Sequence, residues 1–404
     1  MSHNRDGGLG IRVVTRLYRP FLPAPVPDLE DVVFLQPGPV KMHPRVLRAM
    51  SRPVLHHRTP EFKDEMTRLA NGLKQVFQTK SDVVVLAGSG TAGMEAAVAG
   101  LVGKGDRVVA VDNGKFGERL GQIGSLHGEC AVVKAPWGEA VAVDAVAAAL
   151  EEAPTKALAF VYNETSTGVV NPGHELCKVA KKHGAFVIMD AITALGSVDV
   201  PVDAWGVDVC ITGSQKCMAG PTGLALVSVS ARAEAALRKW SLYLDLGKHL
   251  KKIREGDSPY TPAVPLVLGM REAVDITLEE GLPARFARTR RLANATRASA
   301  EALKLPLYAK AGARSDTVTA IGYPAGMADA DKRIRNRLKD VHRVHVAGGQ
   351  DATKGKGFRI GHMGNVTPGE IVAYVHALEE CLAAAGHGFQ HGAGVAAASD
   401  ALQR

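Results

Sequence analysis

A lysine, an aspartate and a glycine-rich turn carry most of the chemistry that this sequence offers. Lys216 lies in ITGSQKCMAG, directly after the apolar run from Val207 to Ile211, and Asp190 ends the apolar stretch AFVIMD. An unpaired buried ammonium is costly and tends to lose its proton, so a lysine in such surroundings is a candidate nucleophile. Asp190 alone would also suit a helix N-cap, and its functional interpretation requires a cationic partner.

The glycine-rich turn precedes both residues in the chain. In LAGSGTAGMEAAVAG, a GxGxxG pattern over residues 88–93 follows an apolar run and opens a helical pattern. Free N–H groups and the helix dipole at such a turn bind phosphate, and the hydroxyls of Ser89 and Thr91 add donors. Asp112 ends the next apolar run at the spacing of a dinucleotide-binding fingerprint, so an NAD site is an alternative interpretation.

Together these features favour pyridoxal 5′-phosphate (PLP) over nicotinamide. Ligands of an open α/β sheet bind at the carboxyl ends of its strands, so we expect Asp190 and Lys216 at the same edge as the glycine-rich turn. The aldehyde of PLP would form a Schiff base with Lys216, its phosphate would bind at residues 89–91, and its ring nitrogen would pair with Asp190. Nicotinamide needs no such lysine.

Three further side chains fit around this cofactor. Phe116, in NGKFGER, is placed to stack on the pyridine ring, with ordinary core packing as the alternative. Thr165, in YNETSTGVVNP, stands in a polar loop and is able to donate to the phenolic oxygen. Arg359 interrupts the apolar segment of KGFRIGHMGN, where a guanidinium matches a substrate carboxylate, and a structural ion pair is the alternative.

The elements that must position these residues alternate between strand and helix. Continuous apolar runs separated by amphipathic patterns indicate an α/β fold with a mostly parallel sheet covered by helices. The runs span 83–87, 107–112, 157–162, 185–190, 207–212 and 223–230. After about residue 265 the pattern changes to a long helix and short strands, typical of a smaller α+β domain.

We expect an N-terminal extension at 1–30, a large domain at 31–281, a small domain at 282–385 and a flexible tail at 386–404.

Composition narrows the class of protein. The chain has 404 residues and a net charge of +8. Its basic clusters are spaced as on solvated helix faces, so neither nucleic acid nor membrane is an expected partner. The five cysteines form no CxxC pair, which argues against a disulfide framework or a zinc site and fits a reducing compartment. We therefore expect a cytoplasmic location and no metal. No run reaches the length of a membrane span, and residues 1–30 lack the apolar core of a signal peptide.

The motifs together resemble the class V aminotransferases of the fold-type I PLP enzymes, particularly the alanine:glyoxylate and serine:pyruvate aminotransferase group. The matching segments run in order from about residue 34 to 384, and they are QPGPVKMHPRVLRAM, GSGTAGMEAA, NETSTG, MDAITALGS, TGSQKCMAGPTG, YTPAVPLVLGMREA and FRIGHMG. The resemblance implies a mostly parallel, seven-stranded type of sheet in the large domain, a PLP cofactor, and a homodimer with active sites at its interface.

The resemblance also implies roles for individual residues. Lys216 and Asp190 would be the catalytic pair, Arg359 would hold the substrate carboxylate, and Gly38, in the first motif, would belong to the substrate site. Cofactor contacts would fall to Ser89, Gly90, Thr91, Phe116, Thr165, Gln215 and, from the neighbouring subunit, Thr261. Members of the group have a tyrosine three positions before that threonine, where this chain has Ser258, and Tyr260 stands nearby.

The expected activity is transfer of an amino group from alanine or serine to glyoxylate or pyruvate by a ping-pong mechanism. Aspartate or another donor, with 2-oxoglutarate or pyruvate, is an alternative that gains support if Arg58 reaches the site instead of a surface turn. An NAD-dependent oxidoreductase using residues 88–93 and Asp112 is an alternative from a different class. A cysteine desulfurase needs a cysteine on a mobile loop, whereas Cys217 lies directly beside Lys216.

Overall fold

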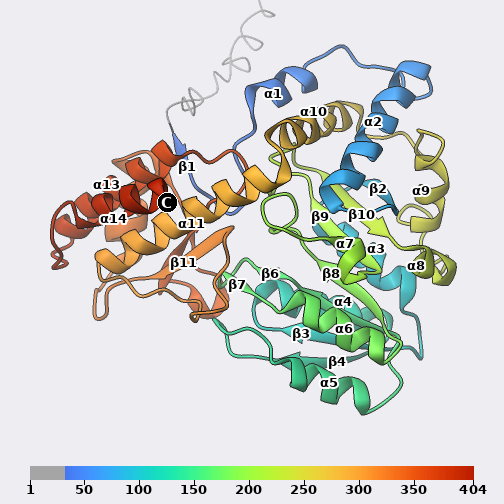
Figure 1. Cartoon of the computed structure of the whole chain (residues 1–404), viewed down its shortest axis with the longest axis horizontal. Helices are drawn as coiled ribbons and strands as arrows, with labels where there is room; N and C mark the ends of the chain where they lie inside the picture. The colour runs from blue at the N-terminus through green and yellow to red at the C-terminus, as the bar shows by residue number, and fades with distance from the viewer. Residues whose placement is uncertain (1–31) are drawn as a thin grey trace, which may run out of the picture. The chain divides into compact units, whose positions relative to one another are not determined.

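The computed structural model describes residues 32–404 (Figure 1). The predicted N-terminal extension at 1–30 lies outside the described residues.

A seven-stranded sheet forms the centre of the larger part of the described chain. Its strands, in spatial order, are β2 (Asp82–Ala87), β10 (Leu224–Val229), β9 (Val209–Gly213), β8 (Phe186–Asp190), β5 (Ala157–Val161), β3 (Arg107–Asp112) and β4 (Glu129–Lys134). All run parallel except β10, which is antiparallel to both of its neighbours. Every residue of β5, β9 and β10 is buried, which requires cover on both faces and explains their continuous apolar sequences. The prediction of a mostly parallel sheet is confirmed.

Helices provide that cover (Figure 1). They are α1 (Pro44–Met50), α2 (Pro60–Phe77), α3 (Gly90–Leu101), α4 (Lys115–His127), α5 (Val143–Glu151), α6 (Gly173–Lys182), α7 (Val202–Trp205), α8 (Ala231–Ala236), α9 (Leu246–Ile253) and α10 (Val264–Glu280). Helix α3 lies very close to the sheet, because a β-carbon at Gly93 would stand only 2.8 Å from Ile211 Cγ2 and 3.1 Å from Ala225 Cβ. That glycine therefore serves helix–sheet packing.

A second hydrophobic core lies in the C-terminal part of the chain. It contains Leu35 and buried residues between 292 and 398, whereas the first core runs from Phe62 to Val274. Its elements are α11 (Leu282–Ala302), β11 (Val318–Gly322), a π-helical turn (Asp331–Asn336), α12 (Arg337–Asp340), β12 (Val344–His345), β13 (Ala347–Gly348), a 3-10 turn (Asp351–Thr353), β14 (Gly357–Gly361), α13 (Pro368–Ala384) and α14 (Ala393–Gln403). Strand β14 pairs with β11 and β13, β1 (Val33–Phe34) pairs with β12, and β6 (Asn163–Glu164) forms a hairpin with β7 (Val169–Val170). The boundary at 281/282 falls between α10 and α11 and stays a prediction, since residues 33–404 form one unit.

The chain beyond residue 386 is not the flexible tail that its simple composition suggested. Residues 393–403 form α14, and Ala398 on this helix is fully buried. The carboxylate of Glu379, on α13, is 3% exposed and accepts hydrogen bonds from the amides of Gly392, Gly394 and Val395. Small residues let α14 approach the core closely, and the carboxylate satisfies amides that the start of a helix leaves free.

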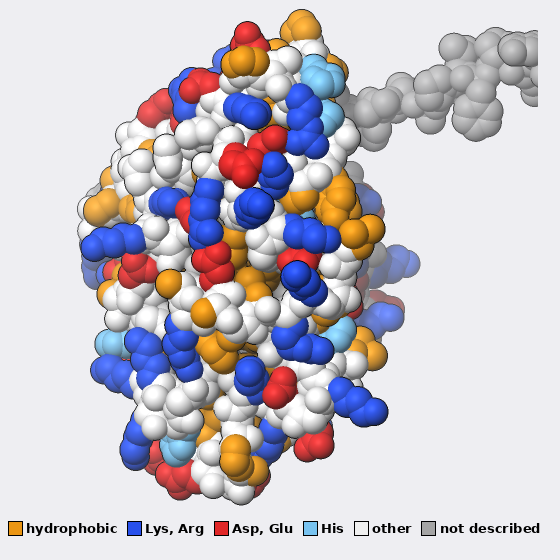
Figure 2. Space-filling view, turned by 90° about the vertical axis from the view of Figure 1, so that its right-hand side faces the viewer, with side chains coloured by type: hydrophobic (Ala, Val, Ile, Leu, Met, Phe, Trp, Pro, Cys, Tyr) orange, Lys and Arg blue, Asp and Glu red, His pale blue; other side chains and the backbone are white. Residues whose placement is uncertain are grey.

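Basic side chains are dispersed over the face shown in Figure 2, where Lys and Arg alternate with acidic and uncharged residues. The net charge of +8 is therefore spread over this face and forms no single stripe there. Among residues 32–404, no helix has both the length and the apolar character needed to cross a membrane. In the same described range, no three His, Cys, Asp or Glu side chains gather as a potential metal site.

Candidate active site

Asp190 and Lys216 meet at the carboxyl edge of the sheet. Asp190 is the last residue of β8 and lies beside Ile211 of β9, while Lys216 follows the end of β9. The Lys216 Nζ donates a hydrogen bond to the carbonyl of Pro37 at 3.0 Å. Gly38, with φ +110°, makes this approach possible, because a β-carbon there would overlap Lys216 Cδ and Nζ. Gly38 thus shapes the space around the lysine.

Burial lowers the pKa of the Lys216 amine. Together with the positive charges of Arg359 and Arg119 it brings the pKa to about 8, against the opposing influence of Cys217 and Asp190. The free amine, which is the form that attacks carbonyl groups, is therefore more abundant at a given pH than in an exposed lysine.

Asp190 has a buried carboxyl group, and its functional role requires a cationic partner. Its side chain is 2% exposed, and its Oδ1 accepts a hydrogen bond from Ile192 N at 2.8 Å. Burial raises its pKa to about 7, with a smaller contribution from the charge of Glu164 and opposing ones from the Ile192 amide, Arg119 and Lys216. A cationic ring nitrogen would supply the missing compensation and keep the carboxylate ionised.

Replacing Asp190 by Asn should change how the stability of the cofactor-free protein depends on pH. The folded carboxyl, with its pKa near 7 against 3.8 in the reference state, binds its proton more tightly than the unfolded one. Its stabilising contribution is complete below about pH 4 and is lost as the pH rises through 7. We therefore expect the free energy of unfolding of the wild type, relative to Asp190→Asn, to fall between pH 4 and 7 in urea titrations. A difference independent of pH would contradict the raised pKa.

The predicted phosphate turn is a glycine-lined cradle. Ser89 is the N-cap of α3 but its side chain makes no cap hydrogen bond. A β-carbon at Gly90 would lie 3.8 Å from Gly213 Cα, and one at Gly213 would lie 3.2 Å from Gln215 Oε1. This Oε1 atom is buried and has no hydrogen-bond partner among the described residues. The helix start and the glycines fit a phosphate group, and the amide nitrogen Nε2 of Gln215 is the atom that can donate to it, whereas the unpartnered Oε1 is an acceptor and needs a different donor.

Thr91 and Phe116 are joined by an arginine that the sequence analysis overlooked. Arg119 donates to Thr91 Oγ1 at 3.2 Å, and its guanidinium carbon lies 4.9 Å from the centre of the Phe116 ring. Arg119 follows Phe116 by one turn of α4, so its helical spacing from a predicted site residue was the available signal. The guanidinium adds positive charge beside the phosphate cradle.

Thr165 and Arg359 are in direct contact through a hydrogen bond. Thr165 Oγ1 is 2.8 Å from Thr193 Oγ1, and the carbonyl of Thr165 accepts a hydrogen bond from Arg359 Nη1 at 3.2 Å. The other nitrogens of Arg359 donate to the carbonyl of Gly348 at 3.0 and 3.1 Å. The structure therefore brings the loop of NETSTG and the arginine of FRIGHMG together across more than 190 residues of chain.

Arg359 is a buried cation that carbonyl groups hold without an ion pair in the described chain. Its side chain is 7% exposed, and burial lowers its pKa to about 10 while the charge of Glu164 raises it. The alternative of a structural ion pair is wrong, since none of the ion pairs formed within residues 32–404 includes it. A buried guanidinium without a carboxylate partner is well suited to bind the carboxylate of a small ligand.

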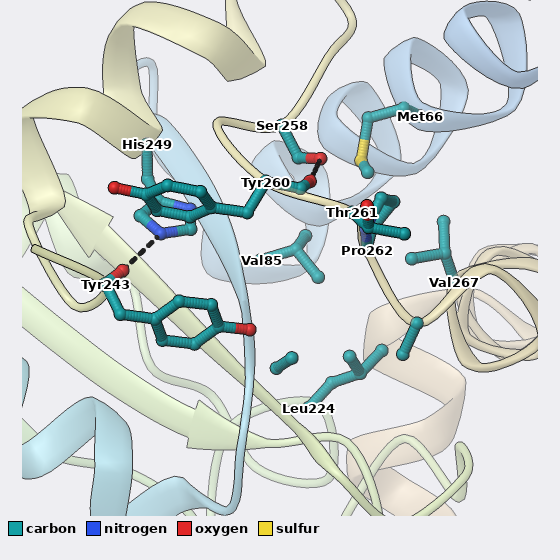
Figure 3. A pocket seen from close by; sticks show the side chains of 12 residues that line it. Met66, Val85, Leu224, Tyr243, His249, Ser258, Tyr260, Thr261, Pro262 and Val267 are labelled. Carbon is teal, nitrogen blue, oxygen red and sulfur yellow. Dashed lines mark hydrogen bonds between the residues drawn. The ribbon is translucent and has the colours of Figure 1, made fainter. Parts of the chain in front are cut away.

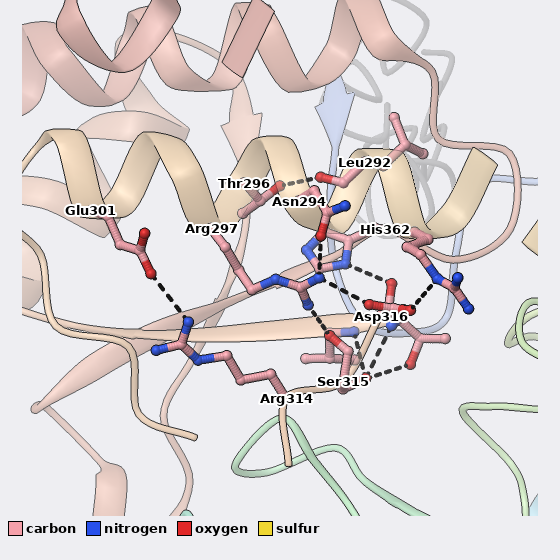
Figure 4. A network of polar contacts seen from close by, with 12 residues as sticks. Leu292, Asn294, Thr296, Arg297, Glu301, Arg314, Ser315, Asp316 and His362 are labelled. Carbon is pink, nitrogen blue, oxygen red and sulfur yellow. Dashed lines mark hydrogen bonds and ion pairs between the residues drawn. The ribbon is translucent and has the colours of Figure 1, made fainter. Parts of the chain in front are cut away.

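A polar network fixes the strands that carry Arg359 (Figure 4). From α11, Arg297 donates to Ser315 O at 2.8 Å and pairs with Asp316 at 2.9 Å, just before β11. His362, directly after β14, is buried, and burial lowers its pKa to about 4. The ring is therefore neutral, and its Nδ1, 3.0 Å from the carbonyl of Asp316, is the donor of that hydrogen bond. These contacts hold β11 and β14 against the long helix.

A buried arginine supports the lysine loop from behind. Arg285, on α11, is 1% exposed and donates to Cys217 O and Gly196 O at 2.6 and 2.8 Å, with Glu280 as its ion-pair partner. The cluster RFARTRR resembles a solvated helix face in the sequence, and that interpretation is wrong for this residue. Only the fold shows that this position of α11 packs against the loop that carries Lys216.

Thr261 is not joined to this group by a hydrogen bond within the described chain. It lines a pocket beside β2 together with Tyr243, His249, Ser258 and Tyr260, and the two tyrosine rings lie stacked (Figure 3). The Tyr260 hydroxyl donates to Leu242 O at 2.6 Å.

Arg58 is bound to Asp257 and Ser258, which directly precede the segment that carries Thr261. It forms an ion pair with Asp257 at 2.8 Å and donates to Ser258 O at 3.2 Å. Its guanidinium is thus already balanced by a carboxylate of its own chain.

The dinucleotide interpretation of residues 88–93 and Asp112 is wrong because of strand order. In a dinucleotide fold the strand before the glycine-rich turn lies beside the strand that ends in the acidic residue. Here β2 is at one edge of the sheet, and four strands separate it from β3, which ends in Asp112. Asp112 instead accepts a hydrogen bond from Gly114 N and lines a surface groove beside α4.

Comparison with known proteins shows the family of this chain, although the relatives carry different names. The model of the family described as "Aminotransferase class-V" matches residues 41–353. The small subunit of a soluble hydrogenase from Synechococcus sp. (strain PCC 6716) is 42% identical over 382 residues, covering 92% of this chain and 99% of the relative. Serine–glyoxylate aminotransferase from Arabidopsis thaliana is 35% identical over 379 residues, covering 91% and 94%. The crystal structure of ureidoglycine–glyoxylate aminotransferase from Bacillus subtilis superposes with a TM-score of 0.88 at 29% identity, covering 95% of this chain and all of that one.

Proposed function

Because the chain belongs to the class-V aminotransferase family, we propose that it transfers the amino group of alanine or serine to glyoxylate or pyruvate. At the coarser level it is a PLP-dependent aminotransferase of the alanine/serine–glyoxylate type, with the fold-type I architecture. The buried guanidinium of Arg359, which has no ion-pair partner among residues 32–404 and whose charge acts on Lys216, is the observation that carries the choice of an amino acid substrate.

The residues of the site fit PLP and divide its binding among them. Ser89, Gly90, Thr91 and Gln215 would hold the phosphate, Phe116 would stack on the ring, and Thr165 would donate to the phenolic oxygen. Bound there, PLP supplies an electron sink for breaking the bond between the substrate α-carbon and its hydrogen.

The proton transfers are assigned to the chain itself. Lys216, with its pKa near 8, would take the proton from the substrate α-carbon as a base and would deliver it, as an acid, to the C4′ carbon of bound PLP. Asp190 remains ionised against a cationic partner, and Arg359 fixes the substrate carboxylate so that the α-hydrogen faces the lysine. The two substrates use the site in turn, which predicts ping-pong kinetics.

A homodimer with shared active sites is part of the proposal. Thr261 lies in a pocket of its own, near the exposed side chains of Leu242 and Tyr243. We assign it to the phosphate site of the neighbouring subunit, as the resemblance of SPYTPAV to the family motif implies. A cytoplasmic location likewise stays a proposal.

The side chain of the substrate is small in this proposal. Arg359 accounts for the α-carboxylate, and Arg58 is occupied by Asp257, which favours donors without a second carboxylate. Aspartate with 2-oxoglutarate or pyruvate is the alternative, and it requires Arg58 to leave that ion pair.

A substrate matrix tests the proposed function. Purified PLP-loaded protein is incubated with alanine, serine or aspartate against glyoxylate, pyruvate or 2-oxoglutarate, and the new amino acid is measured; alanine with pyruvate is left out, because this pair only regenerates itself. We expect kcat/KM to be highest for alanine or serine with glyoxylate or pyruvate, with parallel lines in double-reciprocal plots. Highest kcat/KM for aspartate would favour the alternative, and absence of transfer in every combination would refute the proposal.

A further inference from the structure

We propose that Glu164 is a positioning residue, which links the helix that carries Phe116 to the substrate-binding Arg359 through a hydrogen-bonded cap. The inference deepens the proposed function and rests on it, because it assigns a role within the same site.

Helix α4 has no capping side chain of its own. Its N-cap residue is Gly114, which has no side chain to form a cap. The backbone amides in the first turn of a helix have no partners within the helix and need acceptors from elsewhere. The carboxylate of Glu164, fully buried in the hairpin β6–β7, supplies them: its Oε2 accepts from the amides of Phe116 and Gly117, each at 3.0 Å. The position of the Phe116 backbone is therefore set by a residue nearly fifty positions away.

Ser166 extends this cap to the preceding residue of the helix. Its hydroxyl accepts from Lys115 N at 3.1 Å and donates to Glu164 Oε1 at 2.6 Å, while its amide donates to the same oxygen at 3.0 Å. Both oxygens of Glu164 are thus saturated with donors. A β-carbon at Gly114 would overlap the Glu164 and Ser166 side chains, so the glycine makes room for the cap.

Thr165, the residue between Glu164 and Ser166, contacts the substrate-binding Arg359. Thr165 places its hydroxyl beside Thr193 and gives its carbonyl to Arg359. Three consecutive residues therefore hold the start of α4 with the first and third side chains and hold Arg359 with the backbone of the second. A shift of this loop displaces the stacking ring and the carboxylate-binding group together, and displacements of about 1 Å are enough to cost about 10²-fold in rate.

The charge of Glu164 also acts on two other groups of the site, Asp190 and Arg359. It raises the pKa of Arg359 and of Asp190, and the four hydrogen bonds to it oppose the effect of burial on its own pKa, which remains raised. A buried carboxylate can keep its charge when several donors hold it in a fixed geometry, and the four hydrogen bonds to Glu164 do so.

A purely structural helix cap would have the same hydrogen bonds, and the chain contains a matched example. Glu379 is 3% exposed and accepts from three amides at the start of α14, in the second hydrophobic core. The variants Glu164→Gln and Glu379→Gln make the same chemical change in two buried caps, of which only the first adjoins the candidate site. In each, the new NH2 group faces amide donors that had faced an acceptor.

The test compares three variants with the wild type by urea unfolding, by titration of the cofactor-free protein with PLP, and by steady-state kinetics. We expect both Gln variants to unfold at lower urea. Glu164→Gln should bind PLP about tenfold more weakly, a change of about 1.4 kcal/mol, and raise the KM for the amino donor severalfold, whereas Glu379→Gln should change neither more than twofold. Ser166→Ala removes one donor and should shift PLP affinity and KM in the same direction by less, which keeps the comparison intact if Glu164→Gln does not fold.

Equal PLP affinity and KM in Glu164→Gln and Glu379→Gln, or unchanged values in Ser166→Ala when Glu164→Gln cannot be purified, would overturn the inference while leaving the proposed function standing. A wild type that binds no PLP would overturn the proposed function and this inference with it.

Discussion

Lys216→Ala is expected to lower kcat for transamination by at least about 10³-fold, because general acid–base transfer by a positioned side chain contributes about 10²–10⁴-fold and covalent attachment is lost as well. The variant retains the phosphate cradle, the Phe116 ring and Asp190, so it should still bind PLP. Stopped-assay kinetics and the visible absorbance of the protein-bound cofactor measure the two properties separately.

Borohydride reduction identifies the lysine directly. In the wild type, reduction should add the mass of the cofactor to the peptide that contains Lys216, and the same treatment of the variant should leave that peptide unmodified. Lys182→Ala, an exposed position on α6, serves as the matched control and should behave as the wild type in both assays. Turnover within tenfold of the wild type in Lys216→Ala would refute the assignment.

Arg359→Gln is expected to lower kcat/KM for amino acids and 2-oxo acids by about 30-fold or more, since truncating one partner of a buried, hydrogen-bonded charge pair costs about 2–5 kcal/mol. The guanidinium is the buried cation that the substrate carboxylate would balance, and an amide offers no charge for it. Arg359→Lys should recover only part of the loss, because an ammonium lacks the planar fork of donors.

The carboxylate is the part of the substrate that this prediction addresses. A primary amine without a carboxyl group should react equally slowly with wild type and Arg359→Gln in a single-turnover measurement of cofactor absorbance. Arg291→Gln, which removes an exposed arginine of α11, should leave kcat/KM unchanged. An equal loss for the amine and for alanine would show that Arg359 supports the fold and does not bind the carboxylate.

Local sequence was sufficient for the elements and for most of the candidate residues. The runs of β5, β9 and β10 are continuously apolar because both of their faces are covered, and such runs identify parallel strands without an alignment. Asp190 and Lys216 were found because a charged residue at the end of a buried strand is unusual. The flexible tail was misjudged, since an alanine-rich segment becomes an ordered helix only when another element covers it.

Other parts of the site depend on contacts between distant segments. Strand order separates β2 from β3 and so removes the dinucleotide interpretation, although the spacing of residues 88–93 and Asp112 fits it perfectly well. Arg119 and Glu164 were missed because charged residues in a helix or a loop are ordinary in isolation. Arg285 was taken for a surface residue because helical spacing does not tell which face a neighbour will cover.

The sequence by itself therefore determined which chemical groups are present and at which ends of which strands they stand, because backbone geometry and hydrophobic periodicity are local properties. Only the tertiary structure decided how each charge is balanced. The pKa of Lys216, the unpaired state of Arg359 within the described chain and the cap that Glu164 places on α4 all arise from groups tens to hundreds of residues apart. Electrostatic energies depend on burial and on distance in space, and neither is encoded in the spacing of residues along the chain.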